Sequence, residues 1–511
     1  MALDSMSYIV RGTCRFIFAI VPALVSCCLH AQTPALSVAG AKVGITSNQN
    51  GAAPNFEFFM DPAGYPRTVT QGETVVTMGT WPNGNNPTFS DDKSNTWTAV
   101  TNCLDSSNLR HGFFYAVNAA AGTSTITETH SSAIQNTVFD WAHFYNMATS
   151  GSLDGSSCTN GVTPANNTVP NISGTTYSTT AGDLILTCVY VEQGSLGTPN
   201  AISSITSQSG FTLLSEDTTY GHSCAYGIAA GGSFTPSYTV AQGTHNSFTI
   251  MSAAFKSGTG GTAPPSGAAI ALSEMHYASG SGQTDTVNLP CPSGTSAVAV
   301  LGDAGAITNV TDSGSSTWGH VTVSPPYWGP IYYANNPTIS NPNTYKVTIT
   351  YGSTGGWDLD GLFCLVGTNG IDTAAKAQNG STLTGANSGS TYATANVSGG
   401  TANDAPAIGT SAPGDLVLDV GAMGFGPVDS CQTGYCVFDY VGSTNWTAGD
   451  NSSYANGDMM AHVYVPTAST ARFNFNIGSG SSPTLSGISL AFLSANTSPI
   501  LPPSGLTAIV H

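Results

Sequence analysis

Short apolar runs with β-branched and aromatic side chains recur along the whole chain, and turns rich in Gly, Pro, Asn and Ser separate them. Clear examples are residues 55–59, 74–78 and 331–336, and residues 123–130 alternate between polar and apolar positions. Such runs, bounded by turn residues, are typical of β-strands. No long stretch has the 3.6-residue period of an amphipathic helix, and the many Gly and Pro residues argue against one. The pattern predicts an all-β fold.

One polar turn that leads into an aromatic strand occurs more than once. Residues 90–100 (SDDKSNTWTAV) return in an altered form as residues 311–321 (TDSGSSTWGHV), and weaker copies lie at 207–214 and 442–448. Self-similarity of this kind is typical of repeat architectures. We therefore expect several copies of one structural unit.

The spacing of the repeats indicates the size of the unit. Tyr115, Tyr226 and Tyr333 hold matching places about 110 residues apart, close to the roughly 100 residues of an immunoglobulin-like sandwich. The first and third copies resemble each other most. We predict four tandem antiparallel β-sandwich units that arose by duplication of a pair. The expected segments are a signal peptide (1–31), sandwiches 1 to 4 (32–158, 159–258, 268–370 and 371–496), a linker (259–267) and a C-terminal tail (497–511).

Composition and charge narrow the possible partners. A chain of 511 residues is too long for one core. Only 7% of its residues are charged, against roughly 25% in an ordinary soluble domain, so hydroxyls, amides and glycines must keep it in solution. The formal net charge of -18 repels phosphate backbones and anionic membrane surfaces. Nucleic acid is therefore excluded as a partner.

The Gly- and Pro-rich linker is expected to let the two halves reorient.

The N-terminal residues have the pattern of an export signal. Arg11 and Arg15 precede an apolar run, and cleavage is expected after Ala31. The alternative is a lipobox at residues 24–27, in which Cys27 carries a lipid anchor. Both interpretations predict a secreted or cell-surface protein. No later stretch is long and apolar enough for a transmembrane span.

The cysteines predict a disulfide framework. Eight of the eleven lie after the signal, an even number in an exported chain. Assigning two to each unit predicts four pairs: Cys103 with Cys158, Cys188 with Cys224, Cys291 with Cys364, and Cys431 with Cys436. The alternative is that some are buried free thiols. Because no CxxC pair or group of histidines accompanies them, we predict no metal site and no cofactor.

Aromatic residues fall into two classes. Trp97, Phe211, Trp318 and Trp446 recur at one place in each unit and are interpreted as core residues. The aromatics that do not recur are the candidate ligand-binding residues, because flat rings beside Asn and Gly suit stacking on a sugar: Trp81, Tyr327 and Trp328. The alternative is that they pack on the edge of their own sandwich.

No catalytic residue is predicted. Asp91 and Asp312 recur, as do Asp140 and Asp358, which favours turn capping or strand-edge polarity over catalysis. The chain contains no HExxH motif and no nucleophile elbow followed by Asp and His. A glycoside hydrolase with two carboxylates that meet only in space stays open.

Several short motifs resemble those of exported bacterial proteins built from tandem immunoglobulin-like or jelly-roll β-sandwich modules. The motifs in this chain are Gly72-Glu73, Asn95-Thr96-Trp97, Tyr115-Ala116-Val117-Asn118, Ala121-Gly122, Leu153-Asp154, Thr317-Trp318, Tyr333-Ala334-Asn335-Asn336 and Ile371-Asp372. The resemblance spans residues 40–496 and implies a surface or secreted module without an assigned catalytic residue.

Three functions follow in order of preference. The first is a non-enzymatic extracellular adhesion or surface-structural protein. The second is a carbohydrate-binding protein that uses the loop aromatics, and the third is an extracellular carbohydrate-active enzyme. The expected partner is an extracellular glycan or another cell-surface protein.

Overall fold

The computed structural model describes most of the chain between residues 32 and 495. The described ranges are 32–45, 55–81, 87–104, 110–130, 137–162, 171–192, 204–218, 221–241, 247–278, 284–302, 307–321, 330–352, 358–373, 376–378, 390–396, 402–404, 407–423, 437–441, 457–468, 470–471, 474–476 and 484–495. The expected signal peptide and tail, and the candidate lipid-anchor residue Cys27, lie outside these ranges.

The predicted all-β class is confirmed. The described residues form β-strands, together with one short 3₁₀ turn at Pro342–Thr344. We name four regions by their strands: region 1 comprises β1 to β8, region 2 β9 to β18, region 3 β19 to β26, and region 4 β27 to β37. None of the helical structure described is long and apolar enough to cross a membrane.

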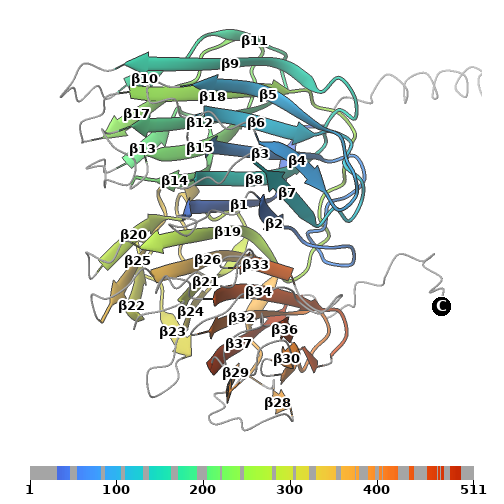
Figure 1. Cartoon of the computed structure of the whole chain (residues 1–511), viewed down its shortest axis with the longest axis vertical. Helices are drawn as coiled ribbons and strands as arrows, with labels where there is room; N and C mark the ends of the chain where they lie inside the picture. Colours follow the sequence, from blue (N-terminus) through green and yellow to red (C-terminus); the bar gives the residue numbers. More distant parts are fainter. Residues whose placement is uncertain are drawn as a thin grey trace, which may run out of the picture.

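A ten-stranded sheet runs through the middle of the molecule (Figure 1). Its strands are β1 (Ala35–Ile45), β3 (Thr74–Trp81), β5 (Trp97–Leu104), β6 (Arg110–Ala116), β8 (Thr137–Tyr145), β19 (Ala269–Ala278), β21 (Thr295–Gly302), β23 (Trp318–Val321), β24 (Ile331–Asn335) and β26 (Asp358–Val366). At its centre β1 pairs in parallel with β19, with Ala39 opposite Leu272. The large sheets of regions 1 and 3 are therefore one continuous sheet.

Smaller sheets complete regions 1 and 3. In region 1 the order is β2-β7-β4, and in region 3 it is β20-β25-β22. The bounds are β2 (Asn55–Phe59), β4 (Thr88–Asp91), β7 (Thr125–Thr129), β20 (Thr284–Asn288), β22 (Ile307–Asp312) and β25 (Lys346–Tyr351).

Region 2 has one large sheet, β14-β15-β12-β18-β9, with the small sheets β10-β17-β13 and β11-β16. The bounds are β9 (Leu153–Val162), β10 (Asn171–Ser173), β11 (Tyr177–Thr179), β12 (Leu184–Glu192), β13 (Ser204–Ser207), β14 (Thr212–Asp217), β15 (His222–Ile228), β16 (Gly232–Phe234), β17 (Ser237–Ala241) and β18 (Ser247–Phe255).

Region 4 is built in a similar way. Its large sheet is β27-β37-β32-β34-β33, with β29 also on β37, and its small sheets are β28-β31-β35 and β30-β36. The bounds are β27 (Thr368–Ile371), β28 (Lys376–Gln378), β29 (Ser390–Asn396), β30 (Ala402–Asp404), β31 (Ala407–Gly409), β32 (Asp415–Met423), β33 (Val437–Val441), β34 (Gly457–Val465), β35 (Thr470–Ala471), β36 (Asn474–Asn476) and β37 (Thr484–Ser494).

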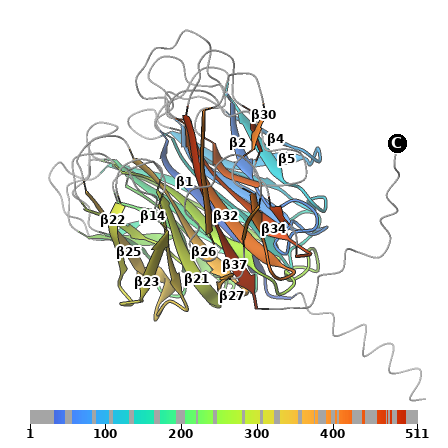
Figure 2. The ribbon, with the colours of Figure 1, turned by 90° about the horizontal axis from the view of Figure 1, so that it is seen from below.

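The central sheet buries both of its faces, because alternate residues of a strand point to opposite sides. Val76 and Val298 lie on what we call face A, which the large sheet of region 2 and the β20-β25-β22 sheet cover. Val75 lies on face B under the β2-β7-β4 sheet, and Ala297 lies on face B under region 4. Figure 2 shows β22 and β25 on one side of β21 and β26, and β32 and β34 on the other.

The two halves are related by an approximate twofold rotation. Read outward from the centre, the order β1-β8-β3-β6-β5 matches β19-β26-β21-β24-β23. Because β1 and β19 are parallel while the covering layers exchange faces, a half-turn about an axis along these strands relates the halves. Tyr115 packs against Phe255 in one half, and Tyr333 packs against Phe492 in the other. This arrangement supports a duplicated pair.

The repeated turn has similar hydrogen bonds in regions 1 and 3. Asp91 accepts a bond from the indole N–H of Trp97 at 2.8 Å, and Asp312 accepts one from Trp318 at 3.1 Å. Each aspartate also caps backbone N–H groups of its own turn. The prediction that these aspartates cap turns is therefore confirmed. The two tryptophans are only half-buried, with one edge of each on the core.

The linker between the halves is not a free hinge, so the expected reorientation is wrong. Gly260 N–H bonds to the carbonyl of Met147 at 2.8 Å, and Gly261 N–H bonds to that of Gln71 at 3.1 Å. A Cβ on Gly260 would lie 2.3 Å from the carbonyl oxygen of Gly72. Glycine is needed here because two backbones touch.

Two predicted boundaries fall inside strands. β9 pairs with β18, so the division at 158/159 cuts a strand of the region 2 sheet. β27 pairs with β37, so the division at 370/371 cuts a strand of region 4. β9 follows β8 after residues 146–152, and β27 follows β26 after Gly367 alone, so neither crossing has a long Gly- or Pro-rich linker.

Three of the predicted disulfides are present: Cys103–Cys158, Cys188–Cys224 and Cys291–Cys364. The first joins β5 to β9 and therefore links regions 1 and 2, although it was expected to stay within one unit. Cys431 and Cys436 lie outside the described residues. The bridges indicate an oxidising environment.

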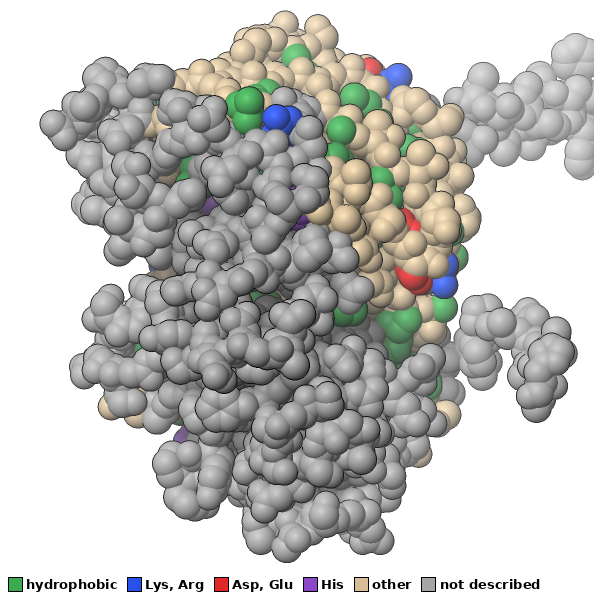
Figure 3. All heavy atoms as spheres, in the orientation of Figure 1, with side chains coloured by type: hydrophobic (Ala, Val, Ile, Leu, Met, Phe, Trp, Pro, Cys, Tyr) green, Lys and Arg blue, Asp and Glu red, His purple; other side chains and the backbone are tan. Residues whose placement is uncertain are grey.

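The described surface carries few charges. In Figure 3 its visible part is mostly neutral and polar, with isolated charged and apolar side chains. This surface agrees with the low charged fraction of the sequence.

Candidate functional site

The structure does not support Trp81 as a ligand platform, so this part of the prediction is wrong. Trp81 is the last residue of β3 and is 1% exposed. Its indole N–H donates to Glu128, and its ring packs against Phe114 and Phe139. Val75 and Trp81 share face B, so the strand carries the ring into the core of region 1. Tyr327 and Trp328 lie outside the described ranges.

A row of buried polar side chains crosses face A near one end of the central sheet. Asp140 on β8 and Glu274 on β19 both lie opposite Ala41 of β1. His276 follows two residues after Glu274 and therefore shares its face. Asp360 on β26 lies opposite His276. These polar residues replace the Val and Leu residues that occupy face A elsewhere.

A pocket lies beside this row, where region 2 meets region 3. β14 supplies one wall, β20 and β25 supply the other, and His276 of β19 belongs to the lining. The lining residues are Glu216, Asp217, Thr218, His276, Asp285, Thr286, Val287, Asn288 and Lys346. All but Val287 carry polar or charged side chains. Both halves of the molecule therefore contribute to one polar pocket.

His276 and Asp285 form an ion pair in the pocket. His276 Nε2 lies 2.5 Å from Asp285 Oδ2. Burial lowers the pKa of His276, but the surrounding carboxylates, Asp285 first, outweigh this effect and raise the pKa to about 10. Burial alone would raise the pKa of Asp285, but the positive charge of His276 lowers it. The pair is therefore charged at neutral pH.

Glu216 faces the same pocket, and its pKa is shifted in the direction opposite to that of Asp285. It accepts hydrogen bonds from the backbone N–H of Ile205 at 2.6 Å and from the amide of Asn288. Burial raises the pKa of Glu216, and these bonds oppose the rise only in part. Asp217 adds a repulsive charge that raises it further. The pocket thus holds Glu216, whose pKa is raised, and Asp285, whose pKa is lowered.

Glu274 lies behind the pocket and is fully buried. Neither carboxylate oxygen has a hydrogen-bond partner among the described residues. Burial raises the pKa of Glu274 well above its ordinary value, and the charge of His276 only partly offsets this. Asp217, Asp140 and Glu216 raise it further. The surroundings of Glu274 therefore disfavour its charged form.

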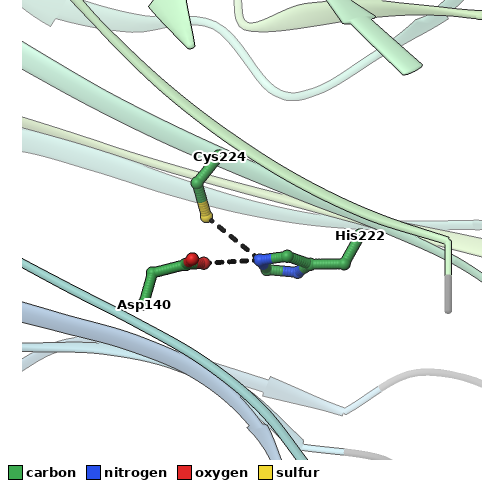
Figure 4. A group of neighbouring side chains, drawn as sticks. All are labelled: Asp140, His222 and Cys224. Atoms are coloured by element: carbon green, nitrogen blue, oxygen red, sulfur yellow. Dashed lines mark hydrogen bonds and ion pairs between the residues drawn. The ribbon is translucent and has the colours of Figure 1, made fainter. Parts of the chain in front are cut away.

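Asp140 extends the cluster to region 2. His222 Nε2 lies 2.5 Å from Asp140 Oδ2 and 3.5 Å from Cys224 Sγ (Figure 4). His222 and Cys224 are two residues apart on β15 and share one face of it. All three side chains are buried between the large sheets of regions 1 and 2. In the oxidised protein Cys224 is bonded to Cys188 and offers no thiolate.

Other buried carboxyl groups serve the fold. Glu73 accepts bonds from Ser37 and Thr70 and pairs with His143 within region 1. Asp183 lies beside Asp154, and burial together with this neighbour raises the pKa of Asp183 to about 6.

Region 4 repeats the arrangement of Asp154 and Asp183. Asp415 lies beside Asp372, and burial first and then this neighbour raise the pKa of Asp415 to about 7. Because the two carboxyl pairs hold matching places where a region begins, we interpret them as part of the repeated fold.

Sequence reasoning missed Glu216, Asp217, His276 and Asp285 because the pocket that they line forms only where regions 2 and 3 meet. Two signals were readable: β14 ends in Glu216-Asp217, and Glu274 and His276 are spaced two apart in an apolar strand. Period-two spacing of ionisable groups on a strand that is otherwise buried indicates a polar cluster on one face. The register between β14 and β20 could not be read from either strand alone.

Comparison with known proteins gives no functional assignment, so function is inferred from this geometry. No protein-family model matches the chain, and no curated protein matches it.

Proposed function

We propose that the chain is an exported, non-enzymatic binding protein of the cell surface or extracellular space. The two halves act as one rigid base, and the pocket between β14 and β20 contacts the ligand. The observation that carries the proposal is this pocket, which lies where regions 2 and 3 meet and is lined by side chains from both. Ligand sites occur preferentially at such junctions.

The lining suggests the class of ligand. Carboxylates, an amide and hydroxyls can accept and donate hydrogen bonds to a molecule rich in hydroxyl groups, and Lys346 adds a cation. Such groups suit a glycan. The disulfides and the small charged fraction fit a protein that works outside the cytoplasm.

The test is a binding measurement on a panel of bacterial and plant glycans, followed by calorimetry on any that bind. Glu216→Gln and Asp285→Asn should each weaken binding by about tenfold or more, because each replaces a carboxyl group that can hydrogen-bond a ligand in the pocket. Asp92→Asn, a surface turn substitution, is the matched control and should bind normally. Equal binding by all four proteins would exclude the pocket, and no binding by any glycan would exclude the ligand class.

The second candidate is a hydrolase that works by general acid–base catalysis on a glycosidic bond. One observation favours it: the pKa of Glu216 is raised and that of Asp285 is lowered at the same pocket. Opposite shifts of two carboxyl groups are the usual basis for acid and base roles.

Release of reducing ends from the same glycans tests this candidate. Hydrolysis that Glu216→Gln abolishes while binding persists would support an enzyme. Binding without release of reducing ends would support the non-enzymatic proposal.

A further inference from the structure

We propose that Asp140, His222, Cys188 and Cys224 form a Zn²⁺ site when the Cys188–Cys224 disulfide is reduced. The donor atoms of Asp140, His222 and Cys224 all lie within 4.8 Å of one another. Asp140 comes from face A of the central sheet, and the other two come from the facing sheet of region 2. Figure 4 shows the three side chains converging from the two layers.

The direction of the imidazole favours a metal site over a catalytic relay. In a relay of Cys, His and Asp, one ring nitrogen faces the nucleophile and the other faces the carboxylate. Here the same nitrogen, His222 Nε2, lies 2.5 Å from Asp140 and 3.5 Å from Cys224. The donor atoms thus point at one common centre, as metal ligands do.

The donor set suits zinc. Zn²⁺ is bound by thiolate sulfur, imidazole nitrogen and carboxylate oxygen, and structural sites have four ligands. Cys188 lies directly opposite Cys224 on β12, so the fourth donor stays adjacent after the disulfide opens. Asp140 Oδ1 is buried and has no hydrogen-bond partner among the described residues, which leaves this carboxylate with unused bonding capacity.

The redox step balances with a dithiol reductant. The reductant gives two electrons and two protons to the Cys188–Cys224 bond and itself becomes a disulfide. Two thiols result, and Zn²⁺ displaces their two protons as it binds the thiolates. The oxidised protein cannot bind in this way, because neither sulfur is a thiolate. The same four residues therefore support two exclusive states.

The experiment uses the full chain, unfolded with a dithiol present and refolded with or without Zn²⁺. After removal of excess metal, elemental mass spectrometry should find one zinc per chain in the reduced protein and none in a sample refolded under oxidising conditions. Co²⁺ in place of Zn²⁺ should give a near-ultraviolet thiolate-to-metal band. A reduced wild-type protein without zinc and without this band would overturn the proposal.

Variants identify the ligands. The pair Cys188→Ser and Cys224→Ser should lose the cobalt band, and Asp140→Asn should weaken zinc binding by about tenfold or more while retaining the band. The pair Cys103→Ser and Cys158→Ser is the matched control and should bind one zinc when reduced. Full zinc and an unchanged band in the Cys188/Cys224 variant would overturn the assignment. The wild-type band decides the proposal if that variant does not fold.

Discussion

The approximate twofold rotation creates two junctions between the halves, and they differ in chemistry. At one, β14 of region 2 meets β20 of region 3 around the polar pocket. At the other, β2 of region 1 meets β33 of region 4. Beside this second contact His462 bonds to Asp61 at 2.6 Å, and Tyr65 packs against His462 and Tyr464. Junctions related by the twofold rotation thus differ: one carries a cluster of acids, and the other carries the Asp61–His462 pair among the described side chains.

The difference shows which residues belong to the fold and which were added to one half. The turn aspartates and the paired acids at the region boundaries occur in both halves, as expected for structural groups. Glu274 and His276 occur only on β19, since β1 (ALSVAGAKVGI) contains no Asp, Glu or His. Buried ionisable groups are costly and mark candidate sites where they do not repeat.

The largest effect is expected at the second junction. Asp61→Ala should lower the free energy of unfolding by about 3–5 kcal/mol, because it leaves His462 buried without its carboxylate. Urea unfolding of the purified chain measures it. Asp92→Ala, at an exposed turn, is the control and should cost far less. A loss below about 1 kcal/mol would mean that the Asp61–His462 pair does not hold this junction together.

The next-largest effect on stability is expected for Glu274→Gln. Because burial raises the pKa of Glu274, the folded protein binds its proton more tightly than the unfolded chain does, and stability falls as pH rises from the unfolded towards the folded pKa. Glutamine has no proton to lose, so the variant should be more stable than wild type at pH 8 and gain less at pH 4.5. Thermal unfolding at both pH values checks this. A variant that is less stable at pH 8 would show that the charged form of Glu274 is required.

His276→Gln should change the pH dependence in a different window. The raised pKa of His276 adds stability that is fully present below its ordinary value of about 6.5 and is lost as pH rises through about 10. The advantage of wild type over the variant should therefore shrink between these pH values. Parallel melting curves that stay equally far apart from pH 6 to pH 10 would contradict the ion pair with Asp285.

The smallest effect is expected at the pocket rim. Thr286 is exposed there, so Thr286→Ala should change the free energy of unfolding by less than about 0.5 kcal/mol. The same substitution should still weaken ligand binding at the pocket. Urea unfolding and calorimetry on one preparation separate the two effects.

The sequence predicted the strands well because strand signals are local. Alternation and turn residues identified the all-β class, and the cysteine count with the repeat assigned Cys188–Cys224 and Cys291–Cys364 correctly. The parallel pairing of β1 with β19 was not foreseen, because each strand has the composition of an ordinary buried strand. Trp81 was misread because a ring at the end of a strand and a ring in a loop have the same local sequence. The candidate site depends on register between regions, which has no local signal.

The pairing of β1 with β19 also sets an order for folding during translation. β1 is made early, and its parallel partner follows more than 200 residues later. Until then one edge of β1 has no strand beside it, and such edges readily pair with other chains. Contacts that are so distant in sequence also slow folding. The second half must therefore be synthesised before the first half can complete its sheet. Chains that stop midway should associate through the open edge of β1.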